Sequence, residues 1–315
     1  MTTATAFNLG LAVLVMVLAY WTVLARGAFA ATVGFVAYGL LLAFIWIRLG
    51  AVDVAVTEAA IGGGLSGVLM LGAAARLRAS EALIAAETTA AGRRLWAAAL
   101  SAVTALALVT SVLLLPDPAP TLAPAAAENA AATTLGNPVT NVLMAFRALD
   151  TMLEKVVLLL ALVGVWSLGP DRFWGGRLGP RHRADPEGML VFLAQLLPPA
   201  GVVVGIYVFW VGANAPGGAF QGGTILAAMW LLAMMAGLTD TPPSGSRRAR
   251  LVLVAGPSAF LIVGLGGLWL GEAFLAYPLA YAKPLILGIE FAMVPTIAVT
   301  LGLLLAGPPE RSAGS

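Results

Sequence analysis

The stretch FRALDTMLEKVVLLLALVGVWSL, residues 146–168, joins a charged head to a tail that carries no charge. A membrane-spanning helix needs about 20 mostly apolar residues, and the stretch has this length and composition. It therefore predicts a membrane helix with a group of charges near one end. The charged residues all fall in its first ten positions: Arg147, Asp150, Glu154 and Lys155.

The composition of the whole chain also predicts a membrane protein. Hydrophobic residues make up 60% of its 315 residues and charged residues 10%, whereas soluble domains are about 45–50% apolar. The chain has no cysteine and one histidine, His182, so it has no ligand set for an iron–sulfur cluster, a haem or a His/Cys zinc site. We therefore expect no cofactor and no metal. We also expect no nucleic acid as a partner, because the basic residues lie in short loops between apolar runs.

The apolar runs predict an all-α, polytopic, multi-pass protein of the cell (inner) membrane. Counting runs of about 20 mostly apolar residues gives about nine transmembrane helices. The spans lie near residues 7–25, 28–47, 53–75, 95–115, 142–168, 189–210, 219–238, 250–271 and 284–307.

The basic residues predict the direction of these spans. If nine spans alternate, only Arg48 and Lys283 lie in loops on one side of the membrane. Cytoplasmic loops are rich in lysine and arginine, so we expect the N-terminus outside and the C-terminus in the cytoplasm. The basic residues on the cytoplasmic side are then Arg26, Arg76, Arg78, Arg93, Arg94, Arg172, Arg177, Arg181, Arg183, Arg247, Arg248, Arg250 and Arg311.

The charges of residues 147–155 fall on one side of a continuous helix. At about 100° per residue, Arg147, Asp150 and Glu154 share a narrow sector, and Lys155 widens it. Charged groups inside a membrane usually face a protein interior, a partner charge or water. Such a cluster can pass protons or bind a cation, and it can equally lock the helix to a neighbour. The residues alone favour neither hypothesis.

The stretch GAVDVAVTEAAIGGGLSG, residues 50–67, places two carboxylates at the start of the third span. Asp53 lies near the outer end, and Glu58 lies five residues deeper, about 7.5 Å along a helix. Glu58 has no ionisable neighbour within one turn, so we expect its partner on another helix or on a different polypeptide. The glycines that follow it are typical of close helix packing.

A glycine-rich segment, NAPGGAFQGG, separates the sixth and seventh spans. It lacks the Gly-Lys-Ser/Thr ending of a nucleotide-binding loop. A re-entrant or half-helix element and a tight, ordered turn both remain open. Its candidate residues are Asn214, Pro216, Gly217, Gly218, Phe220, Gln221, Gly222 and Gly223.

Glu290 is a lone carboxylate about two turns into the last span. The nearest basic residue on that helix is Lys283, seven residues earlier and on the same face, at a rise of about 10 Å. An ion pair between them would need water or the full reach of both side chains. As an intramembrane carboxylate, Glu290 is a site candidate.

Three of these stretches together resemble components of Mrp-type multisubunit Na+/H+ antiporters. AVDVAVTEAAIGGGLSGVLML and NVLMAFRALDTMLEKVVLLLALVGVWSL are similar to successive C-terminal segments of the component with the long antiporter-like helical core, here called the core component. IYVFWVGANAPGGAFQGGTILAA is similar to the PGGGFQGG signature of the MnhB component. The chain thus resembles a fusion of the end of the core component with MnhB. Similar modules occur in membrane-bound hydrogenases related to respiratory complex I.

The resemblance implies four segments and a set of partners. Residues 1–80 correspond to a three-helix MbhD-like module, 94–170 to a two-helix MbhE-like module, 171–188 to a basic cytoplasmic linker and 189–308 to a four-helix, MnhB-like module. The implied partners are other subunits of a hetero-oligomeric membrane antiporter, Na+, H+ and the lipid bilayer.

The resemblance also implies roles for individual residues. Glu58, Arg147, Asp150 and Glu154 match charges of the family that are proposed to handle ions, and Asp53 matches an Asp of the same motif. Two departures bear on function. Ala213 stands where MnhB usually has His, which makes pH sensing by this loop doubtful, and Lys155 is an added charge beside Glu154.

Three functions fit these features. The first is an ion-translocating subunit of a cation/proton antiporter, which is not an enzyme. The second is the same membrane module in an energy-converting hydrogenase or dehydrogenase complex, and the third is a structural scaffold for larger antiporter-like subunits.

Overall fold

The computed structural model describes residues 2–310 except 86–90, 119, 181 and 271–272, and for residues 78–85 it describes the backbone alone. Arg181 and Arg311, which were used to predict the orientation, lie outside this part. All named secondary-structure elements of the described residues are helices. The only β-type pairings among these residues are isolated bridges of Arg177 with Pro243 and Leu178 with Pro309. The prediction of an all-α protein is confirmed.

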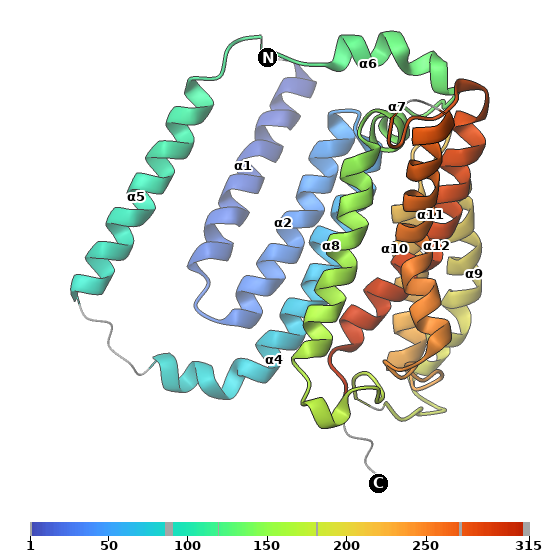
Figure 1. Ribbon diagram of the computed structural model, residues 1–315. Coiled ribbons are helices and arrows are strands. Elements are labelled where there is room, and N and C mark those ends of the chain that lie inside the picture. Colours follow the sequence, from blue (N-terminus) through green and yellow to red (C-terminus); the bar gives the residue numbers. More distant parts are fainter. Residues whose placement is uncertain (1, 86–90, 119, 181, 271–272, 311–315) are drawn as a thin grey trace.

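The first half of the chain forms a row of loosely packed helices (Figure 1). α1 packs on α2, and α2 packs on a third helix in which a π-helical stretch, Glu58–Leu65, interrupts the α-helix. α5 stands apart at the edge of the row and has no buried residue. The bounds are α1 Thr3–Leu24, α2 Ala28–Arg48, α3 Val52–Thr57, α4 Ser66–Ala85 and α5 Ala91–Leu113.

The second half packs more tightly, with α12 at its centre. α12 contacts α8, α10 and α11, and α9 covers the other side of α10. The main core cluster gathers around α12, where Ile286, Ile289 and Ile297 are fully buried. The bounds are α6 Ala123–Asn129, α7 Pro138–Asn141, α8 Ala148–Ser167, α9 Met189–Val211, α10 Ala219–Met235, α11 Arg247–Leu270 and α12 Ala282–Ala306.

Seven helices of the described residues are long and apolar enough to cross a membrane. The set does not include α10, which has 17 residues, or α8, which carries Asp150, Glu154 and Lys155 in its first turns. The structure thus confirms a multi-pass membrane protein, and the count of nine spans is not confirmed. The linkers around residues 116–134 and 169–188 lie at opposite ends of the helices (Figure 1).

The prediction of one continuous helix over residues 142–168 is wrong. A π-helical turn covers Val142–Phe146, and α8 starts only at Ala148. Between them Arg147 leaves the helical conformation, at φ −126° and ψ 34°. The Thr151 hydroxyl donates to the Leu143 carbonyl at 2.6 Å, so a side chain satisfies a backbone group that the break exposes.

The contact of α2 with the π-helical stretch depends on glycine. A Cβ atom added at Gly39 would lie 3.0 Å from the Gly63 nitrogen and 3.1 Å from the Gly62 carbonyl carbon. Both are backbone atoms of a helix, which cannot move aside as a flexible side chain can. The two helices can therefore approach this closely only with glycine at residue 39.

We predict that Gly39→Val separates α2 from Glu58–Leu65 and destabilises the fold by about 1–3 kcal/mol, the usual cost of overpacking. Gly10→Val is the matched control, because a Cβ at Gly10 meets nothing within 4 Å. Thermal unfolding of both variants in detergent tests this. Equal melting temperatures would contradict it.

Candidate functional site

Asp53 is a buried carboxylate in the first turn of α3. Its Oδ1 accepts hydrogen bonds from the backbone N–H of Gly217 at 2.8 Å and from Asn137 Nδ2 at 3.4 Å. A carboxylate is favourable in the first turn of a helix, where free N–H groups point toward it. Asp53 therefore joins α3 to two segments that follow it by 84 and 164 residues.

Asn137 is the centre of this network. Its Oδ1 accepts from the Val139 N–H at 2.9 Å and so caps α7. Its Nδ2 also donates to the carbonyls of Gly212 at 3.1 Å and Ala215 at 3.0 Å. One buried side chain thus connects α3, α7 and the turn that follows α9.

The glycine-rich segment is an ordered turn that leads from α9 into α10. The Gly218 N–H donates back to the Val208 carbonyl at 3.0 Å. Gly217 and Gly218 have φ values of +152° and +128°, which residues with a Cβ rarely adopt. A Cβ at Gly217 would also lie 2.2 Å from the Val208 carbonyl oxygen. Glycine is therefore required at Gly217 for this turn.

Two further side chains hold the same turn. Gln221 Nε2 donates to the Thr57 hydroxyl at 3.1 Å. Lys283 Nζ donates to Asn214 Oδ1 at 3.1 Å and to the Thr134 carbonyl at 3.2 Å. Lys283 is thus bonded to the turn and to the outer linker, and no ion pair between Lys283 and Glu290 exists in the described structure.

Lys155 is a buried cation on α8. Its side chain is 3% exposed, and its Nζ lies 2.8 Å from Glu154 Oε1 and 4.6 Å from the centre of the Phe220 ring. Glu154 itself is 54% exposed. The contact of the Lys155 ammonium with the face of the Phe220 ring is attractive. The Lys155–Glu154 pair extends from the interior beside α10 to the surface of the chain.

Glu290 is the third ionisable group near the start of α10. It is buried in α12, and its Oε1 would lie 3.6 Å from a Cβ at Gly218. Its Oε2 has no hydrogen-bond partner among the described residues. Glu290 therefore faces the N-terminal end of α10, where helix N–H groups are free of intrahelical partners.

Glu58 lies at the first position of the π-helical stretch. Its carboxylate folds over Gly62, where an added Cβ would meet Glu58 Oε1 at 2.0 Å. Within the described part of the chain no hydrogen bond or ion pair of this carboxylate is found. π-helical turns occur frequently at functional sites.

The four charges of residues 147–155 form two separate pairs. Arg147 Nε contacts Asp150 Oδ2 at 2.5 Å, and these side chains are 67% and 55% exposed. The break at Arg147 removes the common helical face on which the cluster was predicted to lie. The exposed pair and the Lys155–Glu154 pair thus have different surroundings.

The structure brings three of the seven predicted ion-path residues to one place, the start of α10. Asp53 reaches it from α3, Lys155 from α8 and Glu290 from α12. Arg147, Asp150 and Glu58 do not contact it.

Sequence reasoning missed Asn137, Thr57 and Thr140. The hydroxyl of Thr140 donates to the Gly212 carbonyl at 2.6 Å. Asn before Pro138 is a helix-start signal, and it could have identified Asn137 as a cap.

Comparisons with known proteins assign both ends of the chain. Residues 189–307 match the family profile described as a domain related to the MnhB subunit of a Na+/H+ antiporter. Residues 13–79 match a second profile, MbhD, which describes one of the MBH subunits. The structure of the Mrp complex from Dietzia sp. DQ12-45-1b contains a chain that is similar over 97% of this chain, with 25% identity and a TM-score of 0.69. The chain is an Mrp-related membrane subunit. The resemblance seen in the sequence is confirmed.

Two other proteins are similar to parts of this Mrp-related subunit. A chain of the membrane-bound sulfane sulfur reductase (MBS), an archaeal respiratory membrane complex, has a similar fold. The similarity covers 67% of the Mrp-related subunit and 98% of the MBS chain, with 24% identity and a TM-score of 0.51. An uncharacterised protein of Methanocaldococcus jannaschii, MJ1307, is 27% identical over 154 residues, which cover 44% of the chain and 59% of MJ1307. The Mrp-related subunit spans only 35% of the Dietzia Mrp chain.

We predict that Asp53→Ala loosens the turn of residues 212–218, because the Gly217 N–H and the Asn137 amide lose an acceptor. An unsatisfied buried donor costs about 1–3 kcal/mol. Hydrogen exchange of residues 212–221 is expected to accelerate. Asp53→Asn is the matched control, since it keeps an oxygen at the same place. Unchanged exchange in Asp53→Ala would rule out this role.

Proposed function

We propose that this Mrp-related subunit is a membrane component of a multisubunit cation/proton antiporter and contributes buried charges to a path for Na+ or H+. The observation that carries the proposal is Lys155, a cation buried inside the chain whose carboxylate partner, Glu154, opens to the surface. Charged side chains inside a membrane are costly and usually mark ion or proton pathways. The family relationship supports the same function.

On this proposal the path uses Glu58, Glu154, Lys155 and Glu290, and Asp53 has a positioning role. Asp53 accepts hydrogen bonds from a backbone N–H and an amide, so it is engaged in holding the turn. Glu58 has no such partner among the described residues, and Glu290 retains an unpaired oxygen. Carboxylates with free oxygens are able to accept a proton or a cation.

The exposed charges of α8 imply a partner protein. Arg147, Asp150 and Glu154 are each more than half exposed on the isolated chain. Charged side chains exposed to lipid within a span are energetically costly. We propose that a larger antiporter-like subunit covers this side of α8 and continues the path.

We also propose nine spans with the N-terminus outside and the C-terminus in the cytoplasm. α8 and α10 then complete the seven long apolar helices. The division into modules at residues 1–80, 94–170 and 189–308, joined by the linker 171–188, belongs to the same proposal. Cysteine accessibility from either side of the membrane tests the orientation.

An ion-translocating module of a redox-driven complex is the second candidate. The similarity of fold to a chain of an archaeal respiratory membrane complex favours it. The chain has no cysteine, so redox centres would belong to partner subunits. Genes for iron–sulfur or nickel–iron proteins beside this gene would favour this function over simple antiport. A pure scaffold is the third candidate.

We predict that Lys155→Met abolishes exchange and leaves assembly intact. Replacing a buried charge by an apolar side chain of similar length is often neutral or stabilising, and the remaining Glu154 is half exposed. Sodium-driven proton movement in inverted vesicles that carry the whole gene cluster is the measurement, with assembly followed on native gels. Leu149→Met, on the exposed side of α8, is the control.

Glu154→Gln is expected to lose exchange as well, and to be the less stable of the two variants. It leaves the Lys155 ammonium buried without a charged partner, which costs up to about 3–5 kcal/mol. Exchange at the wild-type rate in assembled Lys155→Met complexes would remove this pair from the path. If exchange and assembly fell in parallel in both variants, the scaffold function would be favoured.

A further inference from the structure

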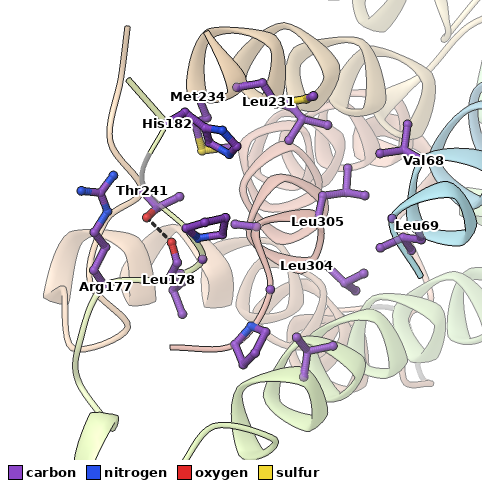
Figure 2. A pocket seen from close by; sticks show the side chains of 18 of the residues that line it. Val68, Leu69, Arg177, Leu178, His182, Leu231, Met234, Thr241, Leu304 and Leu305 are labelled. Carbon is purple, nitrogen blue, oxygen red and sulfur yellow. Dashed lines mark hydrogen bonds between the residues drawn. The ribbon is translucent and has the colours of Figure 1, made fainter. Parts of the chain in front are cut away.

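A cavity of about 510 Å³ lies at the end of the helices opposite to Asp53. It opens between α4 of the first half and the ends of α8, α10 and α12 of the second half (Figure 2). The two halves meet where α3 and the π-helical stretch pack on α10, and α4 makes no comparable contact with α10 or α12. The cavity is thus the space that opens as α4 diverges.

The inner part of the cavity is apolar, and its charged rim is entirely basic. No Asp or Glu is found among the described lining residues. The rim carries Arg76, Arg177 and His182, the single histidine of the chain. The labelled apolar lining in Figure 2 consists of Val68, Leu69, Leu178, Leu231, Met234, Leu304 and Leu305.

Two of the basic side chains at the rim have no carboxylate partner. Arg177 is paired with Asp240, so its charge is largely compensated. Arg76 and His182 have no ion pair among the described residues. Arg76 and Val68 both line the cavity from α4 and are eight residues apart, which is about 12 Å along the helix. The cavity therefore leads from a basic rim into the apolar layer.

We propose that this cavity binds an acyl chain of an anionic phospholipid, whose phosphate lies at Arg76 and His182. The volume falls in the range of about 300–1,000 Å³ that is typical of small-molecule sites. A partner helix, about 10–12 Å across, would fill it within roughly one turn. A lipid tail matches the apolar depth, and a phosphate matches a rim without carboxylates. The bound lipid would fill the space between the two halves.

Gly72 allows this site to be closed without disturbing the fold. It lines the cavity on α4, and a Cβ added there meets nothing within 4 Å. Gly72→Leu therefore places a side chain into the space that the acyl chain would occupy. Gly10→Leu adds the same side chain to another membrane helix, also in open space, and serves as the control.

The test uses the assembled complex in nanodiscs that contain phosphatidylglycerol or phosphatidylcholine with a photoreactive acyl chain. After irradiation, labelled peptides are mapped by mass spectrometry. We expect labelling at residues 68–76, 231–235 and 304–308, with preference for phosphatidylglycerol. Gly72→Leu is expected to lose this labelling, and Gly10→Leu to keep it. In Arg76→Gln the preference is expected to fall by about fivefold, the effect of one basic group near an anionic lipid surface.

Three outcomes would overturn the proposal. Equal labelling by the two lipids in the wild type would remove the role of the basic rim. Unchanged labelling in Gly72→Leu would place the lipid outside the cavity. Absence of lipid labelling, together with crosslinks from residues 68–76 to a partner protein, would identify a protein segment as the occupant.

Discussion

The N-terminal end of α10 is the constraint on which the rest of the structure depends. A helix start buried in a membrane protein leaves N–H groups that need partners, because no bulk water is available. Here Gly217, just before α10, donates to Asp53, and Gly218 donates back to Val208. Asn137 fixes the preceding carbonyls. Three parts of the chain that are far apart in sequence therefore meet at one point.

This arrangement explains why so many charges collect in one region. A helix start attracts carboxylates, and both Asp53 and Glu290 lie against it. The buried cation Lys155 is paired with Glu154 and lies over the ring of Phe220 in the first turn of α10. Glu154, the partner of Lys155, is 54% exposed and extends to the surface of the chain. The path that we propose thus follows from how α10 begins.

Much of this could be predicted from the sequence, and the limits have physical causes. Apolar runs predicted the helices well, since length and composition decide membrane insertion. The break at Arg147 was missed because a π-helical turn and the Thr151 hydroxyl repair the backbone bonds, and no Pro or Gly marks the position. The partner of Asp53 is 164 residues away, and no local periodicity contains such a contact. Lys283 contacts Asn214, whereas the sequence pointed to Glu290 on the same helix as its possible partner. This contact also depends on tertiary packing.

The two halves of the chain are joined by hydrogen bonds at one end of the helices and separated by a cavity at the other end. At the Asp53 end, hydrogen bonds of the Asp53 and Asn137 side chains hold α3, α7 and the turn before α10 together. At the other end, α4 and α12 are separated by a cavity with an apolar interior. The two halves are therefore in contact near Asp53 and lie apart at the cavity. Glu58 lies between these two ends, on a π-helical stretch that continues directly into α4. The segment that carries Glu58 and the cavity-lining part of α4 are thus parts of one continuous helix.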